Sequence, residues 1–323
     1  MSTAYLLGVE IGGTKLQVAL GTPDGRIVEL AQGRVDRGRG PAGILEWLAA
    51  NAAALNARAG EHGGDVCGIG VGFGGPLETV GGRIIESVQI PDWEGFELGH
   101  WFEDHFDLPT QVYNDSSAAG YGEYRLGSGR GTSEFFYTNI GSGIGGSLIV
   151  DGRLYDGQGV GAAEFGQTRI PDWTSSRPGA DIKLEALCSG WGIEQRLRAP
   201  GYVPADSAVL DLAGGAIERI TCSALGAAAA GGDAFALAEL DAVARGFGTA
   251  LASLLVMFQP ERIAIGGGVA LIGEPLLEPI RRHTAERAFI SNLGRYDIVA
   301  CELGEGVVLH GALLLAPHTT AAA

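Results

Sequence analysis

The sequence predicts an α/β protein of two domains, each a mixed sheet flanked by helices, with an interdomain cleft. Three observations support this fold class. The chain has 323 residues, more than one hydrophobic core usually accommodates. A pattern of strand, Gly turn, strand, Asp-Gly turn and strand occurs twice, and a long helical segment and a short β-rich run follow each occurrence. Because this arrangement of a sheet covered by helices occurs twice in the sequence, we expect two α/β domains.

The first occurrence begins at residues 9–20, VEIGGTKLQVAL, where the letters GGT and a lysine join two apolar runs. A tight link between two strands favours positive φ, which glycine adopts at no steric cost. We therefore expect Gly12 and Gly13 to have positive φ. The next turn, TPDG at 22–25, is followed by the third strand, RIVELA.

The second occurrence lies at residues 134–155, where EFFYTNI, GSG, IGGSLIV, Asp-Gly and RLYD follow in the same order. Ile-Gly-Gly-Thr in the first copy is echoed by Ile-Gly-Ser-Gly, and residues 24–26, Asp-Gly-Arg, are echoed by 151–153. We interpret this pattern as an internal duplication. The alternative is a single large α/β domain in which two turns agree by accident, because 54 glycines make such agreement common.

Helices and strands are predicted after both copies. In the first half a helix is expected at 43–59 and a strand at 66–72, and in the second half a helix at 236–258 and a strand at 262–268. A further short strand is expected to end at Tyr113, before an Ala/Gly/Tyr-rich helix. Helices that alternate with short strands are typical of α/β domains.

Composition and charge restrict the partners of this chain. It is 46% hydrophobic and carries a net charge of −16, a balance that disfavours nucleic acid and anionic membrane surfaces. The N-terminus has no basic segment typical of a secretory signal, and we expect no membrane span. Four widely spaced cysteines suit a reducing cytoplasm. These are Cys67, Cys188, Cys222 and Cys301.

The two Gly-rich turns predict a phosphate site. Consecutive backbone amides in the turns at 12–15 and 141–143 can point at one anion, with Lys15 assisting. Glu10 could hold Mg²⁺ through water, because Mg²⁺ prefers oxygen ligands and keeps much of its hydration. Each turn alone is more often a plain hairpin. Together, and in the same order, they favour a triphosphate ligand.

Five motifs follow one another along nearly the whole chain: EIGGTK at 10–15, Asn-Asp at 114–115, IGSGIGGSLIVDGRL at 140–154, Glu-Phe-Gly at 164–166 and IAIGGGV at 263–269. This set resembles the ordered motifs of the ROK family, named for repressors, open reading frames and kinases. The resemblance implies the actin-like ATPase fold, with two ribonuclease-H-like domains hinged over ATP and a sugar.

The resemblance also implies domain limits and site residues. An N-terminal domain of residues 1–117 is expected to include the C-terminal helix 305–318, and residues 118–304 form the second domain. The implied ATP and phosphate site comprises Gly12, Gly13, Thr14, Lys15, Gly141, Ser142, Gly143, Gly266, Gly267 and Gly268. The implied sugar site comprises Gly75, Gln89, Asn114, Asp115, Glu164, Gln167 and Glu185.

Asp115 is the expected catalytic residue. It would accept the proton of a sugar hydroxyl as that hydroxyl attacks the γ-phosphorus of ATP, while Asn114 holds a neighbouring hydroxyl. Asn and Asp are also good helix caps, so the alternative is that Asp115 only caps the helix that follows.

The chain departs from the family pattern at several positions. Relatives supply one His and three Cys to a structural zinc, but the corresponding residues here are Gln167, Ser176, Pro178 and Lys183. No zinc is therefore expected, because Zn²⁺ needs four N or S donors. We expect packing of Trp173 and the rigidity of two prolines, Pro171 and Pro178, to hold this segment instead. Gln167 in place of the family His and Gln89 in place of an Asn leave the exact sugar open. A smaller departure is Glu10 in place of the commoner Asp.

Three functions compete at this stage. The first is an ATP-dependent kinase for the 6-hydroxyl of glucose or a related hexose or amino sugar, with ATP and Mg²⁺ as cofactors. The second is a non-catalytic, sugar-binding regulatory member of the family, but only nine residues precede Glu10, too few for a helix-turn-helix domain. The third is another actin-like ATPase, which would lack the glutamates at 164 and 185. Family members also commonly dimerise, so a homodimer is conceivable.

Overall fold

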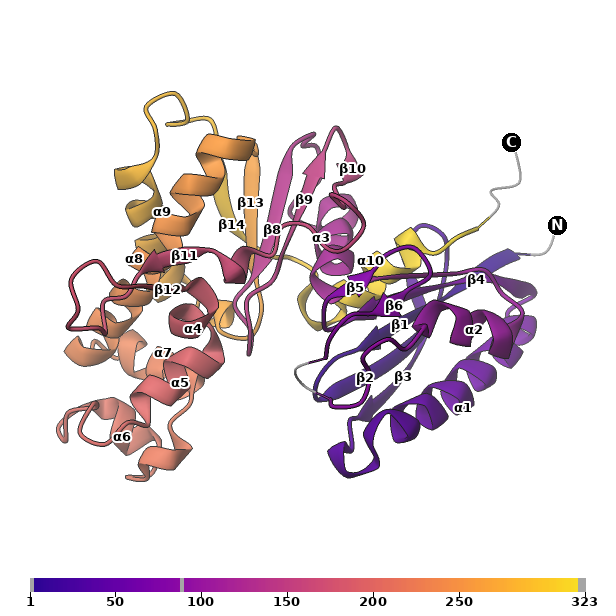
Figure 1. The fold of residues 1–323 in the computed structure, drawn as a ribbon, viewed down its shortest axis with the longest axis horizontal. Coiled ribbons are helices and arrows are strands. Elements are labelled where there is room, and N and C mark those ends of the chain that lie inside the picture. Colours follow the sequence, from indigo (N-terminus) through magenta and orange to yellow (C-terminus); the bar gives the residue numbers. More distant parts are fainter. Residues whose placement is uncertain (1–2, 88–89, 319–323) are drawn as a thin grey trace. The chain divides into compact units, whose positions relative to one another are not determined.

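The computed structural model describes residues 3–87 and 90–318 (Figure 1). Contacts between residues divide the chain into two compact units. The first unit contains 1–131, 147–162 and 302–323, and the second contains 132–146 and 163–301. The domain limits expected from the sequence stay a prediction.

The two sheets have the same strand order, as the duplication predicts. Each sheet combines a three-stranded meander with two further strands, which continue the sheet beside the first strand of the meander. The strand orders are β3-β2-β1-β4-β7 and β10-β9-β8-β13-β14. The first comprises β1 (Thr3–Ile11), β2 (Lys15–Gly21), β3 (Ile27–Arg34), β4 (Gly64–Phe73) and β7 (Thr110–Asn114). The second comprises β8 (Phe135–Asn139), β9 (Gly146–Val150), β10 (Arg153–Leu154), β13 (Arg262–Gly266) and β14 (Asp297–Ala300). β1, β4 and β7 are parallel, as are β8, β13 and β14.

The turns in the two meanders differ from the sequence prediction in one respect. Neither Gly12 nor Gly13 has a positive φ, so the expected reason for those glycines is wrong. A hydrogen bond of 3.0 Å from the Gly12 amide to the Lys15 carbonyl closes that hairpin instead. The second turn does use the left-handed region in both copies, because Gly25 has φ 84° and Gly152 has φ 75°.

Helices of the first unit cover its sheet (Figure 1). α1 (Gly40–Glu61) buries residues at helical spacing, from Ile44 and Leu48 to Ala59. α10 (Val307–Leu315) packs on α3 (Asp115–Leu126), β1 and β4. Helices α3 and α10 approach so closely that a Cβ on Gly311 would lie 1.7 Å from the Ala118 carbonyl oxygen, which only glycine permits there. The first unit also contains β5 (Leu77–Glu78), β6 (Arg83–Ile84) and α2 (Leu98–Phe106).

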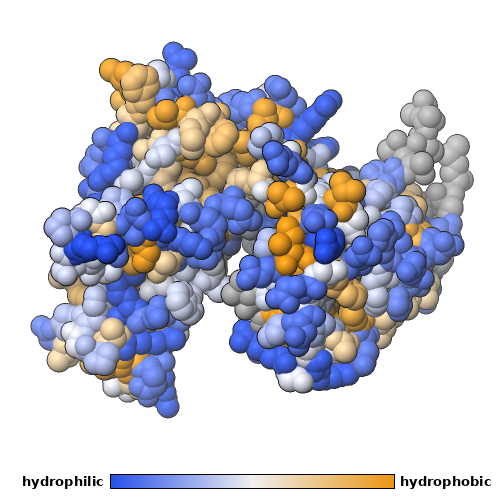
Figure 2. Space-filling model, in the orientation of Figure 1, coloured by the Kyte–Doolittle hydropathy of each residue, from blue (hydrophilic) through white to orange (hydrophobic). Residues whose placement is uncertain are grey.

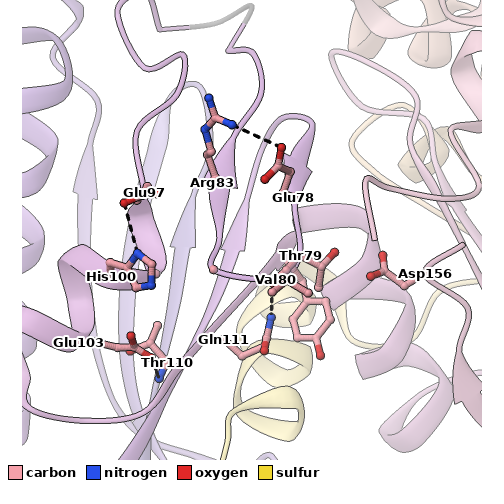
Figure 3. A pocket seen from close by; sticks show the side chains of 13 residues that line it. Glu78, Thr79, Val80, Arg83, Glu97, His100, Glu103, Thr110, Gln111 and Asp156 are labelled. Atoms are coloured by element: carbon pink, nitrogen blue, oxygen red, sulfur yellow. Dashed lines mark hydrogen bonds and ion pairs between the residues drawn. The ribbon is translucent and has the colours of Figure 1, made fainter. Parts of the chain in front are cut away.

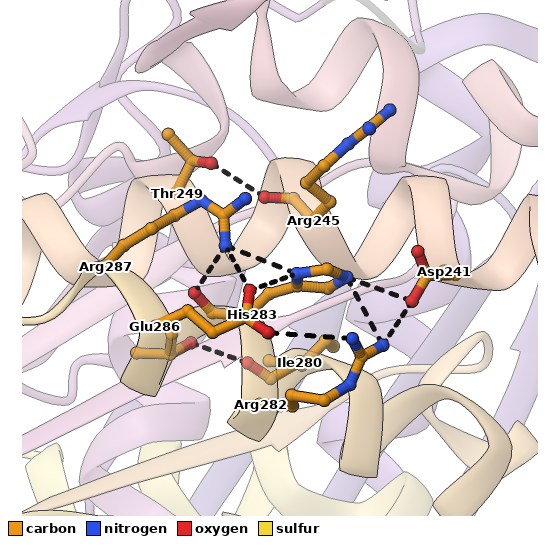
Figure 4. A network of polar contacts seen from close by, with 9 residues as sticks. Asp241, Arg245, Thr249, Ile280, Arg282, His283, Glu286 and Arg287 are labelled. Carbon is orange, nitrogen blue, oxygen red and sulfur yellow. Dashed lines mark hydrogen bonds and ion pairs between the residues drawn. The ribbon is translucent and has the colours of Figure 1, made fainter.

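The second unit is mostly helical. Its two longest helices, α8 (Ala234–Phe258) and α9 (Glu274–Arg287), pack together, and His283 of α9 is buried against Gly248 of α8. Figure 4 shows the His283 ring between Asp241, at 3.0 Å, and Glu286, at 3.2 Å. The other elements are β11 (Arg169–Pro171), β12 (Asp181–Lys183), α4 (Leu184–Cys188), α5 (Gly190–Leu197), α6 (Ala208–Leu212) and α7 (Cys222–Ala230).

One described helix is long and apolar enough to cross a membrane by length and composition, although no apolar run of that length was expected from the sequence. This helix is α8, and 61% of its most apolar window is buried within the protein. The core helix of a soluble protein meets the same criterion, which makes the signal weak evidence for a membrane span. The face drawn in Figure 2 is mostly hydrophilic, with scattered apolar areas.

Candidate functional site

Asn114 and Asp115 lie where β7 ends and α3 begins. Asn114 is the helix cap, because its side-chain oxygen accepts the Ser116 amide at 2.9 Å. Its side-chain nitrogen donates to the Gly75 carbonyl oxygen at 3.1 Å. The alternative in which Asp115 serves as the cap is therefore wrong, and the Asp115 carboxylate is left for another role.

The Asp115 carboxylate is partly buried next to the end of β1. A Cβ on Gly74 would lie 3.2 Å from its Oδ2 atom, and the Gly74 amide donates to the Ile11 carbonyl at 2.9 Å. Burial raises the pKa of Asp115, an effect larger than the opposing hydrogen bonds from Ser116, whose hydroxyl lies 3.2 Å from Oδ1. A carboxylate with a raised pKa is a better proton acceptor than an exposed one.

Glu10 is buried near the end of β1, with 8% of its surface exposed. Its Oε2 atom forms an ion pair of 3.2 Å with the Lys15 ammonium. Burial nevertheless raises the pKa of Glu10 to about 7, opposed by Lys15 and reinforced by the negative charges of Asp115 and Glu305. Glu10 therefore lies next to one lysine and close to two further acidic residues.

The turn at 12–15 presents unused backbone donors. Within residues 3–87 and 90–318, the amides of Gly13 and Thr14 have no hydrogen-bond partner. Lys15 also donates from its ammonium to the Glu305 carbonyl oxygen at 3.2 Å. Adjacent amides and an ammonium form a suitable anion site. Glu305 was missed by sequence reasoning, since it lies nearly 300 positions away and has no motif of its own.

The second unit contains a corresponding turn. The Gly141 amide donates to the Gly143 carbonyl at 2.9 Å, and the first amides of α5, Gly190 and Trp191, donate to the carbonyls of Gly141 and Ser142. Those contacts fix the carbonyls of the turn. In the described part of the chain the amides of Ser142 and Gly143 have no partner, so this turn too can accept an anion.

The predicted sugar-side glutamates lie next to that turn. Glu185, in α4, accepts the Ile144 amide at 2.8 Å through Oε2. A Cβ on Gly166 would lie 2.2 Å from the Ile144 carbonyl oxygen, so the short helix Phe165–Gln167 packs on the other side of Ile144. Glu164 and Gln167, at the ends of this helix, are exposed. Ile144 thus contacts both Glu185 and the short helix whose ends are Glu164 and Gln167.

The third Gly-rich loop, residues 266–268, is joined to the same turn. The Ile140 amide donates to the Gly266 carbonyl, and the Val269 amide donates to the Ile140 carbonyl, both at 2.8 Å. Gly267 has φ 87°, and a Cβ there would lie 2.6 Å from the backbone of Ile140, so no other residue fits. The structure therefore brings the loops at 141–143 and 266–268 together. Gln89 lies outside the described residues.

The residues at the family zinc positions do not fit a zinc ion. Gln167, Ser176, Pro178 and Lys183 offer neither a thiolate nor an imidazole. Among the residues that the structure describes, no three His, Cys, Asp or Glu side chains are grouped so as to hold a metal.

Other contacts hold the segment around residues 170–185. β11 pairs with β12, and Trp173 packs on α8 so closely that a Cβ on Gly246 would lie 2.8 Å from its ring. The guanidinium of Arg196 lies 5.8 Å from the centre of the Trp173 ring. Packing of Trp173 was expected from the sequence, but Arg196 was not.

Arg196 is the centre of a buried polar network. It donates to Glu239 Oε1 at 2.8 Å and to the Leu187 carbonyl at 3.0 Å, at the end of the helix that carries Glu185. Tyr202 donates its hydroxyl to the other Glu239 oxygen at 2.8 Å. Only 8% of the Arg196 side chain and 5% of the Glu239 side chain are exposed. This network braces α4 through side-chain contacts.

The first unit also has a cavity of about 540 Å³ that contains none of the predicted site residues (Figure 3). Charged side chains line much of it, including Glu78, Arg83, His100 and Asp156, and several are paired with one another. Tyr113, which precedes the Asn-Asp pair, also lines this cavity. The cavity is therefore separate from the cluster around Asp115.

Comparisons with known proteins identify the family of this chain. The ROK family model matches residues 6–319. A glucokinase from Halalkalibacterium halodurans is 33% identical over 88% of this chain and 86% of its own, and one from Streptomyces coelicolor is 30% identical over 96% of both. A crystal structure of a ROK family glucokinase from Streptomyces griseus, in complex with glucose and AMPPNP, is 29% identical with a TM-score of 0.80, over 97% of this chain and 99% of that one. The chain belongs to the ROK family.

Proposed function

We propose that this chain is an ATP-dependent hexose kinase that phosphorylates glucose, or a closely similar hexose, on its 6-hydroxyl. The observation that carries the proposal is the placement of Asp115, a partly buried carboxylate with a raised pKa next to a turn with unused amides. Glucokinases at about 30% identity over most of the chain support the enzyme class. The identity of the sugar and the hydroxyl that is phosphorylated are proposed in addition to this enzyme class.

The proposed reaction is an in-line phosphoryl transfer. Asp115 accepts the proton of the 6-hydroxyl while that oxygen forms a bond to the γ-phosphorus, and the bond from the γ-phosphorus to the β-phosphate oxygen breaks to release ADP. Asp115 then gives its proton to solvent. Sugar contacts are proposed for Gly75, Gln89, Asn114, Glu164, Gln167 and Glu185.

The ATP contacts follow from the three Gly-rich loops. We assign the phosphates to the residues of the two turns and the adenosine to the third loop: Gly12, Gly13, Thr14, Lys15, Gly141, Ser142, Gly143, Gly266, Gly267 and Gly268. Glu10 fits a magnesium ion bound through water, because its neighbours Asp115 and Glu305 are also acidic. The ion would neutralise charge on the phosphates. We also propose a cytoplasmic location and leave a homodimer as an expectation.

A panel of sugars tests this function. ADP release is measured with glucose, mannose, glucosamine, N-acetylglucosamine and N-acetylmannosamine at saturating ATP. We expect the highest kcat/KM with glucose and no turnover with 6-deoxyglucose, which lacks only the acceptor hydroxyl. ATP hydrolysis without sugar should be weak, because closure over the sugar excludes water. Rapid hydrolysis in the absence of any sugar would contradict the proposal and favour an ATPase.

A second experiment tests how the segment at 170–185 is held. A zinc-selective chelator, with Mg²⁺ retained, is expected to change neither the melting temperature nor the activity. Arg196→Met should cost about 3–5 kcal/mol of stability, because Glu239 stays buried without its cation. Arg169→Met is the matched control: its ion pair with Asp181 is exposed and should be worth about 0–1 kcal/mol. Urea unfolding measures both variants, and loss of stability with the chelator would contradict this assignment.

A further inference from the structure

Glu123 is a fully buried glutamate on α3, the helix that begins at Asp115. A buried carboxylate is costly unless donors surround it. Its Oε2 atom accepts the amide and the hydroxyl of Ser128, both at 2.9 Å. Its Oε1 atom accepts the amides of Glu302 at 2.9 Å and Leu303 at 2.7 Å. Four hydrogen bonds to one carboxylate make a rigid local anchor.

The donors come from two segments of the first unit. One precedes the chain's first passage into the second unit, and the other follows its last return from it. The chain leaves the first unit after Gly131 and finally returns to it at Glu302. Ser128 precedes the first of these passages, and residues 302–303 follow the last. An exposed ion pair of 3.0 Å between Arg130 and Glu302 joins the same two segments. The other two passages, after residues 146 and 162, have no contact with the Glu123 carboxylate among the described residues.

The chain near Glu123 is shaped to accommodate its carboxylate. A Cβ on Gly127 would lie 2.1 Å from Glu123 Oε2, so a larger residue at this position would displace the carboxylate. The amides of Gly127 and Gly129 both donate to the Glu123 carbonyl at 3.0 Å. The end of α3 therefore wraps around its own glutamate and directs residue 128 to it.

We propose that Glu123 is a positioning residue that couples movement between the units to Asp115 through α3. Domain closure in an enzyme depends on a few hinge residues at the ends of elements or in loops, which absorb the changes in φ and ψ. Glu123 anchors both segments to α3 at once. A movement of these segments therefore moves α3, and with it the Asp115 carboxylate on the first turn of the helix. This inference rests on the proposed kinase function, in which the sugar promotes closure.

The test compares two rates of ADP release at saturating substrates, one with glucose present and one without sugar. The measured quantity is the ratio of the first rate to the second. A loss of folded enzyme lowers both rates equally, so the ratio does not change with stability alone. In Glu123→Gln the new NH₂ group faces at least one backbone N–H donor in either orientation, so a hydrogen bond is lost and the anchor loosens. We expect the ratio and kcat with glucose to fall about tenfold, which corresponds to ~1.4 kcal/mol, and the KM for ATP to stay within about twofold.

Two further variants keep the test decisive. Ser128→Ala removes one of the four hydrogen bonds without introducing a new donor, and should lower the ratio by about two- to threefold even if Glu123→Gln does not fold. Asp233→Asn is the matched control in the second unit, where this carboxylate accepts the amides of Ala208 and Ala236. It should lower the melting temperature with no change in the ratio.

The outcomes separate this inference from the proposed function. If the wild-type enzyme shows no sugar-stimulated ADP release, the proposed function fails. If the wild type is stimulated, and Glu123→Gln and Ser128→Ala lower only the melting temperature with the ratio unchanged, Glu123 is purely structural and the inference is overturned.

Discussion

Replacing Asp115 by Asn is expected to lower kcat for glucose phosphorylation by about 10²–10⁴-fold, the usual contribution of a positioned general base. The amide has nearly the same shape, so Asn114 should still cap α3 through Ser116. It cannot accept the proton of the sugar hydroxyl at neutral pH. Steady-state kinetics should show a large fall in kcat and little change in the KM for ATP, because the lost interaction forms mainly in the transition state.

The control for this variant is Asp104→Asn, an exposed carboxylate on α2. Its kinetics should match those of the wild type. Because burial raises the pKa of Asp115, Asp115→Asn should also be at least as stable as the wild type at pH 8. Equal kcat in the Asp115 variant and the wild type would refute the assignment of the base.

Replacing Glu10 by Gln is expected to raise stability and lower activity. The pKa of Glu10 is raised from 4.5 to about 7 in the folded protein. The folded state therefore binds the proton more tightly than the unfolded state, and wild-type stability falls as the pH rises from about 4.5 to about 7. Gln cannot ionise and avoids this loss. The free energy of unfolding of the variant minus that of the wild type should therefore be about 3 kcal/mol larger above pH 7 than below pH 4.5.

Urea unfolding at pH 4 and pH 8, without nucleotide or Mg²⁺, measures this effect. Glu46→Gln is the control, since Glu46 is exposed on α1 and should show no such pH dependence. Activity of Glu10→Gln should fall with a higher Mg²⁺ requirement, because the proposed carboxylate partner of the ion is missing. A stability difference from the wild type that is the same at both pH values would show that Glu10 does not titrate as inferred.

The fold could be predicted from the sequence because the same turn residues occur in both copies of the duplication. Asp-Gly pairs at 24–25 and 151–152 demand a left-handed residue, and their local chemistry identifies the second turn of each meander. The turn at Gly12 and Gly13 was placed correctly for a wrong reason. In the described part of the chain this turn leaves the amides of Gly13 and Thr14 without a partner and does not place its glycines at positive φ. Backbone angles of that kind depend on neighbours distant in sequence.

Contacts between distant residues were beyond sequence reasoning. Arg196 and Glu239 are 43 positions apart, and Glu123 meets Leu303 across 180. A lone Arg or Glu on a helix is usually solvated, so nothing local distinguishes these buried side chains. The same limitation explains α8, whose apolar composition reflects burial in the second unit. The family motifs located the loops, whereas their supporting contacts had to be seen in the structure.

The close contact between Gly311 of α10 and Ala118 of α3 has a consequence for biosynthesis. Helix α10 belongs to the first unit although the whole second unit precedes it along the chain. A ribosome that has made residues 1–131 has not yet made the helix that covers β1 and β4. The first unit must therefore wait, with an apolar surface uncovered, until α10 has been made, and transiently exposed apolar surface of this kind is prone to aggregation and is what chaperones protect.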